Sequence, residues 1–86
     1  MAQYRKKPVV IEAVQYDGTN DAEIVALNGS DEDLNFGKVL GGAVFCDIST
    51  REGVMRAEVG DWVIKGVKSE LYPCKPDIFE MTYEAV

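Results

Sequence analysis

Aromatic and cationic side chains lie close together in the last third of the chain, from Glu58 to Tyr83. An indole can serve as a stacking platform for a planar ligand, and nearby ammonium groups can hold a phosphate. The plainer interpretation makes Trp62 the main core anchor of a small sheet. The residues of the candidate ligand site are Trp62, Lys65, Lys68, Tyr72 and Lys75, together with Arg5, Lys6 and Lys7.

The basic run Arg5-Lys6-Lys7 has two interpretations of its own. As a solvated leader to an edge of the sheet, it needs no partner. As a functional segment, it would bind an anion or an acidic surface, including the acidic region of a second copy of the chain. From Ile11 to Gly37 the sequence holds seven acids and no Lys or Arg. This complementarity within one chain favours a homo-oligomer.

The net charge of −6 argues against general nucleic-acid binding, because phosphate contacts need a basic face. The acidic block between Ile11 and Gly37 is typical of a solvated surface and a helix start. The functional alternative is a surface that mimics a polyanion or attracts a basic partner.

Catalytic chemistry has little support in this sequence. The chain has no His to act as a general base, and no nucleophile elbow or phosphate-binding glycine motif is present. Asp31 and Asp33 could hold a cation, but the other ligands and the Gly of a calcium loop are missing. We therefore expect a non-enzyme without metal or cofactor. Cys46 and Cys74 are expected to be reduced thiols, with a disulfide between them as the alternative.

The length and composition indicate one folded domain, residues 1–86. Hydrophobic residues make up 47% of the 86 positions and charged residues 28%, which is typical of a globular protein. No apolar run approaches the roughly 18 residues that span a bilayer, and no signal-peptide pattern follows the basic N-terminus. We expect a cytoplasmic protein that does not enter the membrane.

The elements that would position these residues begin with a strand over Val9 to Tyr16. Its apolar residues fall on both faces, which predicts a central strand covered on two sides. A helix is predicted over Asp21 to Asn28, with Asn20 as N-cap and Gly29 at its end. The segment Ser30 to Gly42, rich in Gly, Asn and acids, is predicted to be a loop.

Two hairpins follow, and their side chains predict their registers. A turn at Thr50 to Gly53 gives one apolar face and opposite charges directly across the ladder. A loop at Gly66 to Ser69 gives a second hairpin with a matched charge pair. The expected pairs are Ile48–Met55, Cys46–Ala57, Val44–Val59 and Asp47–Arg56 in the first hairpin, and Ile64–Leu71, Val63–Tyr72 and Lys65–Glu70 in the second.

The C-terminal end is expected to form a cap over the sheet. Pro73 should end its strand, since it cannot donate to a ladder, and Pro76-Asp77 should begin a helical turn. Glu84 to Val86 could add a final edge strand. The predicted fold class is α+β: a small, mostly antiparallel sheet of four to five strands, with one short helix after the first strand and a short C-terminal helical turn.

Two segments, YRKKPVVIEAVQYDG at the start and GDWVIKGVKSELYPCKPDIFEMTYE near the end, carry a family resemblance. They resemble a family of small proteins encoded by bacteriophages and prophages, over about half of the chain. Members often have Gly in the second hairpin loop, where this chain has Ser69. The family supplies no catalytic residues to transfer.

The resemblance implies a small phage accessory protein acting in the host bacterial cytoplasm by stoichiometric binding. The leading hypothesis is an anti-defence factor that sequesters a nucleotide-derived signal. The alternative is a structural or interaction protein: a virion or assembly component, or an inhibitor of a host protein that acts through its acidic surface.

Overall fold

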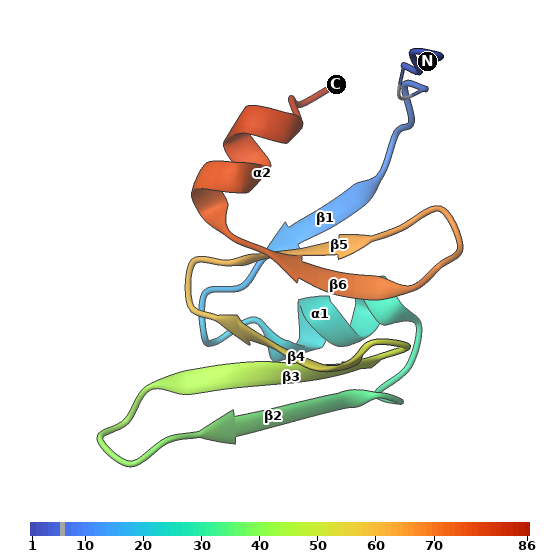
Figure 1. Ribbon diagram of the computed structural model, residues 1–86. Coiled ribbons are helices and arrows are strands. Elements are labelled where there is room, and N and C mark those ends of the chain that lie inside the picture. Colours follow the sequence, from blue (N-terminus) through green and yellow to red (C-terminus); the bar gives the residue numbers. More distant parts are fainter. Residues whose placement is uncertain (6) are drawn as a thin grey trace.

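The computed structural model describes residues 1–5 and 7–86 and has an α+β fold (Figure 1). Its described part contains six strands in two three-stranded antiparallel sheets, ordered β1-β5-β6 and β2-β3-β4, and two helices. The elements are β1 (Glu12–Gln15), α1 (Asp21–Asn28), β2 (Leu34–Lys38), β3 (Val44–Thr50), β4 (Gly53–Glu58), β5 (Trp62–Lys65), β6 (Leu71–Cys74) and α2 (Pro76–Thr82). The predicted α+β class is confirmed, whereas the prediction of four to five strands was too low. Neither helix is long and apolar enough to cross a membrane.

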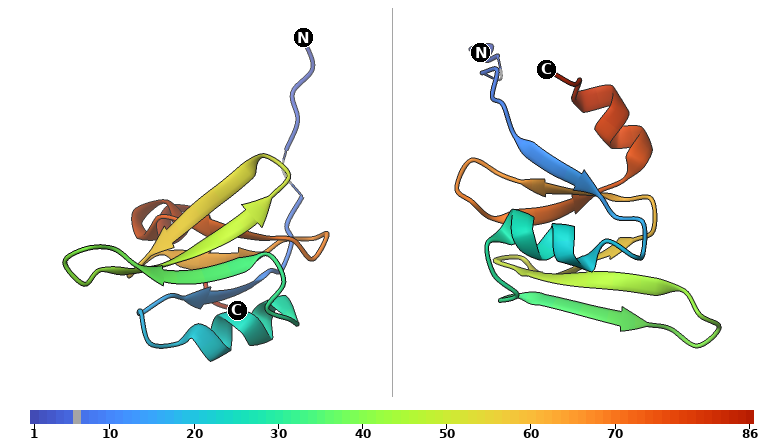
Figure 2. Two further views of the ribbon diagram at one scale, coloured as in Figure 1. Left: turned by 90° about the horizontal axis from the view of Figure 1, so that it is seen from below. Right: turned by 180° about the vertical axis from the view of Figure 1, so that it is seen from behind.

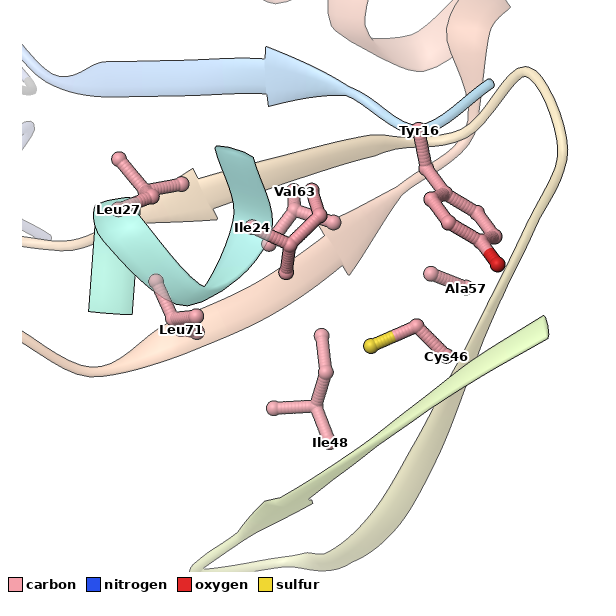
Figure 3. Packing of buried hydrophobic residues seen from close by; sticks show 8 residues of the cluster. All are labelled: Tyr16, Ile24, Leu27, Cys46, Ile48, Ala57, Val63 and Leu71. Carbon is pink, nitrogen blue, oxygen red and sulfur yellow. The ribbon is translucent and has the colours of Figure 1, made fainter. Parts of the chain in front are cut away.

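The core lies between the two sheets and is closed by α1 (Figures 1 and 2). Ile24 and Leu27 of α1 point into it, beside Val63 and Leu71 from one sheet and Cys46, Ile48 and Ala57 from the other (Figure 3). Tyr16 fills the end where β1 leaves its sheet, and its side chain is buried. This arrangement buries one face of each sheet, which is the main stabilising contribution available to a chain of this size.

Helix α1 begins and ends at the predicted residues, but its N-terminus is not capped as predicted. The Asn20 side chain makes no capping bond. Its Oδ1 accepts from the Asp17 backbone N at 2.9 Å and its Nδ2 donates to the Gln15 carbonyl at 2.8 Å, so it braces the preceding turn instead. At the other end Gly29 takes φ 87° and its N–H bonds back to the Val25 and Ala26 carbonyls, a conformation that glycine adopts without strain.

The register of the β3–β4 hairpin is confirmed. Cys46 lies opposite Ala57, Ile48 opposite Met55, and Asp47 opposite Arg56. The Arg56 guanidinium donates to both carboxylate oxygens of Asp47, at 2.8 and 3.1 Å, and also lies over the ring of Phe45, 3.6 Å from its centroid. A bidentate pair of this kind favours one register over its neighbours.

The register predicted for the β5–β6 hairpin was wrong by one residue. Ile64 lies opposite Tyr72, and Lys65 lies opposite Leu71. The loop is longer than predicted, because Gly66 N–H bonds to the Glu70 carbonyl at 2.8 Å and Ser69 N–H bonds to the Gly66 carbonyl at 3.0 Å. Leu71 therefore shares the core face with Val63, whereas Ile64 and Tyr72 share the opposite face, which carries α2.

The first strand is shorter than predicted and lies in a different place. β1 begins at Glu12 rather than Val9, and it forms an edge of its sheet, with β5 in the centre. Pro73 does not end β6 but lies within it; β6 is the other edge strand, where a residue without an N–H is tolerated. The segment Glu84 to Val86 forms no strand.

The predicted loop from Ser30 to Gly42 contains a strand, β2, which pairs with β3. Leu34 and Phe36 of β2 are partly buried and pack against the core. Gly37 made this segment resemble a loop, but it has a packing role: a Cβ there would collide with the ring of Phe45 on the neighbouring strand. The predicted C-terminal helical turn is confirmed as α2, which has Pro76 in its first turn.

Candidate functional site

A groove of about 800 Å³ opens on the face of the β1-β5-β6 sheet that points away from the core. Residues from Lys7 to Ile11 line one side of it, and α2 with the residues after it lines the other. Figure 1 shows α2 beside this sheet. Its lining is mainly apolar and aromatic, with Val9, Ile11, Trp62, Tyr72, Phe79 and Tyr83 among its residues. Concave aromatic surfaces of this size are typical small-ligand sites.

Trp62 is half-buried and lies against α2 rather than in the core between the sheets. Its ring stacks on Phe79, with centroids 4.1 Å apart and planes 6° from parallel. Phe79 in turn packs against Tyr83, with ring centroids 5.1 Å apart. The indole therefore anchors α2, and Phe79 covers one of its two faces. The remaining indole surface contributes to the groove.

Tyr72 supplies a polar group to this aromatic lining. Burial, together with hydrogen bonding to Tyr83, raises the pKa of the Tyr72 phenol to about 12. The phenol thus stays protonated at neutral pH and keeps its hydroxyl hydrogen. Phe79 and Tyr83 were not among the residues proposed from the sequence. Their spacing of four residues after Pro76, which puts both on one helix face, was the signal that could have identified them.

The lysines proposed from the last third of the chain do not converge on the groove. Lys75 Nζ lies 2.9 Å from Asp61 Oδ2 and 3.2 Å from Glu58 Oε1, and these hydrogen bonds raise the pKa of Lys75. Asp61 is only 3% exposed and its Oδ2 also accepts from the Glu58 backbone N at 2.9 Å. Lys75 therefore neutralises a buried carboxylate and holds the turn before β5 to the end of β6.

The other cations lie apart from one another. Lys65 is on the same face of β5 as Val63, away from the groove. Lys68 lines a second hollow of about 900 Å³, between the β5–β6 loop and the β3–β4 turn, where Glu52 and Glu70 are also present. Lys7 lines the groove. Arg5 is exposed beyond it, and Lys6 lies outside the described residues.

Both cysteines are free thiols, so the alternative of a disulfide is not realised. Burial raises the pKa of the Cys46 thiol to about 11, and desolvation also raises the pKa of Cys74. Both side chains are therefore protonated at neutral pH and poor nucleophiles. Among the described residues, no three Cys, Asp or Glu side chains are grouped closely enough to hold a metal ion.

Comparisons of the chain with family models, with curated proteins and with solved structures gave no match. The resemblance to phage-encoded proteins remains a prediction from the residues at the two ends of the chain.

Proposed function

We propose that this protein is a non-catalytic binding protein that sequesters a small ligand with planar rings, in the first instance a nucleotide-derived signal. The aromatic groove beside α2 is the observation that supports the proposal. It combines the free surface of Trp62 with the hydroxyl of Tyr72 and the ammonium group of Lys7. Aromatic rings stack on bases of any sequence, and a lysine can pair with a phosphate.

The charges around the groove limit how many phosphate groups a ligand can carry. Lys7 is the one cation among its described lining residues, and Glu70 and Glu84 also line it. A ligand with many phosphates would meet both carboxylates, so its electrostatic cost would exceed the contribution of a single lysine. We therefore expect a ligand recognised mainly through its rings, such as a cyclic nucleotide, in preference to a nucleoside triphosphate.

The proposal is tested by mixing the purified protein with cyclic mononucleotides, cyclic dinucleotides, cyclic ADP-ribose isomers and ATP. Thermal shift and calorimetry should show binding of at least one cyclic ligand and little binding of ATP. Lys7→Ala should weaken that binding by about tenfold, the loss of one phosphate contact. Lys68→Ala is the matched control, because Lys68 is an exposed lysine in the other hollow.

No heat of binding from any of these ligands, together with an unchanged anti-phage defence assay, would contradict the proposal. Equal effects of Lys7→Ala and Lys68→Ala would place the ligand elsewhere. Mass spectrometry of the denatured protein offers an independent approach, since a sequestered ligand should co-purify in a stoichiometric amount.

A second candidate function, inhibition of a basic host protein, is favoured by the acids around α1. Glu23, Asp31 and Glu32 are all exposed. Charge reversal of these three residues should abolish capture of a basic partner in a pull-down and leave the cyclic-nucleotide panel unaffected. Recovery of the protein in stoichiometric amounts from purified phage particles would instead favour a virion component.

A further inference from the structure

The segment just before β1 carries exposed apolar side chains. Val9 is 48% exposed and Val10 is 78% exposed. The sequence pattern predicts a strand with both faces covered from Val9 onward, yet β1 begins at Glu12 and forms a sheet edge. Figures 1 and 2 show the chain before β1 extending away from the body of the protein. One copy of the chain therefore does not provide the two-sided covering that the sequence pattern predicts for this segment.

The open edge of β1 is able to pair with another strand. Tyr16 N donates to the Asp61 carbonyl at 2.8 Å, and the Tyr16 carbonyl accepts from Gly60 N at 2.7 Å, so both backbone groups of Tyr16 point toward β5. Backbone groups alternate in direction along an antiparallel strand. Val14 and Glu12 therefore also point toward β5, whereas Ala13 and Gln15 point outward.

The same alternation, continued along the extended chain, directs the backbone groups of Ile11 and Val9 outward. Pro8 falls on the other parity, so its missing N–H does not interrupt the outward row. Edge strands that are protected against pairing usually carry a proline, a bulge or an inward charge in that row. In the outward row Val9, Ile11, Ala13 and Gln15 carry neither a proline nor a charge, and its charged members are Arg5 and Lys7 at the N-terminal end.

The charges of the segment favour an antiparallel copy of itself as the partner. Its N-terminal end carries Arg5 and Lys7, and its C-terminal end carries Glu12 and Asp17. Antiparallel pairing brings the cationic end of each copy beside the acidic end of the other, whereas a parallel arrangement would place like charges together.

We propose that the segment before β1 pairs with the same segment of a second copy, antiparallel about a two-fold axis centred on Val10. Ala13 of β1 then lies opposite Lys7 of the partner subunit. The two β1-β5-β6 sheets then join into one, and β1 becomes a central strand. With this centre, Val10 lies opposite Val10 of the partner subunit and Val9 lies opposite Ile11 of the partner subunit, so apolar side chains meet apolar ones. The interface goes beyond the proposed ligand binding and does not depend on it.

The interface is tested with the full chain by sedimentation equilibrium over a dilution series. The wild type should approach twice the 9.5 kDa mass of one chain. Val10→Glu places two carboxylates opposite each other at the axis and should raise the dimer Kd at least about tenfold. Val54→Glu is the matched control: this valine on β4 is 66% exposed and the charge change is the same.

A second variant checks the backbone pairing itself. Ala13→Pro removes an N–H that points outward and leaves the bonds to β5, so it should yield a folded monomer by circular dichroism. A wild type that stays at the mass of one chain at all concentrations would overturn the proposal. So would a dimer that survives both Val10→Glu and Ala13→Pro, or one that Val54→Glu dissociates equally.

Discussion

The pair Asp47–Arg56 is the residue-scale interaction whose dependence on pH can be predicted. Hydrogen bonds from Arg56 lower the pKa of Asp47 below its ordinary value of 3.8. A lowered pKa in the folded state means that the stabilisation is fully present above the unfolded pKa and is lost as pH falls through the folded one. Asp47→Asn should therefore lower Tm by roughly 1 to 5 °C at pH 7. The difference should begin to shrink as pH falls below 3.8 and vanish only below the lower folded-state pKa of Asp47.

Thermal unfolding monitored by circular dichroism between pH 7 and pH 2.5 measures this difference. Glu52→Gln is the control for loss of one negative charge, because Glu52 is exposed in the turn of the same hairpin. If Asp47→Asn and Glu52→Gln follow the same pH curve, the net charge and not the ion pair determines the response.

The partner of Lys75 could not be predicted from the sequence. The position of Lys75 in a segment rich in aromatic and cationic residues favoured a ligand contact. Its actual partner is Asp61, 14 positions earlier and buried at 3% exposure. Nothing in the local sequence distinguishes an Asp that accepts two bonds in a turn from a solvated one. By contrast, Asp47 and Arg56 flank a short turn, so the spacing alone puts them opposite each other.

At the scale of elements, the two hairpins differ in how well their loops could be predicted. The β3–β4 register follows from a turn at Thr50–Gly53, and both an apolar face and an ion pair agree with it. In the β5–β6 hairpin the charge pair Lys65–Glu70 suggested a register that the backbone does not adopt. The loop conformation decided the register, because Ser69 takes φ 64° and closes a longer loop.

That loop conformation leads to a prediction for Ser69. A non-glycine residue in the left-handed region costs about 1 to 2 kcal/mol, which glycine avoids. Glycine also gives the unfolded chain more conformational freedom, and this lowers the stability by about 0.5 to 1 kcal/mol. Ser69→Gly should therefore raise the free energy of unfolding by roughly 0.5 to 1 kcal/mol, as measured in urea.

Lys68→Gly provides the comparison, since the neighbouring Lys68 does not have positive φ. It should destabilise the protein slightly or leave it unchanged. A loss of stability in Ser69→Gly of the same size as in Lys68→Gly would mean that the left-handed conformation of Ser69 carries no cost.

At the scale of the whole molecule, the division into two sheets was the part least accessible from sequence. Side-chain patterns predicted pairing between strands that are neighbours in the chain. The pairing of β1 with β5 joins segments about fifty residues apart, and α1 contributes Ile24 and Leu27 to the core between the sheets. The groove follows from this arrangement, because the segment before β1 and helix α2, which lie far apart in the sequence, both border the β1-β5-β6 sheet.

The groove depends on α2, and α2 depends on Phe79. A helix of seven residues is not stable alone in water, and none of its side chains is fully buried. Its stacking on Trp62, together with the hydrogen bond between Tyr72 and Tyr83, therefore holds it on the sheet. Phe79→Ala should lower the free energy of unfolding by about 1 to 3 kcal/mol, shift the fluorescence of the single Trp to longer wavelength, and abolish ligand binding in the groove.

Met81→Ala is the control, because Met81 is on the same helix but 82% exposed. It should change stability by less than about 0.5 kcal/mol and leave the Trp fluorescence and the ligand binding unchanged. Equal effects of the two substitutions, or a Trp62 spectrum that does not respond to Phe79→Ala, would show that α2 is held by contacts other than this stack.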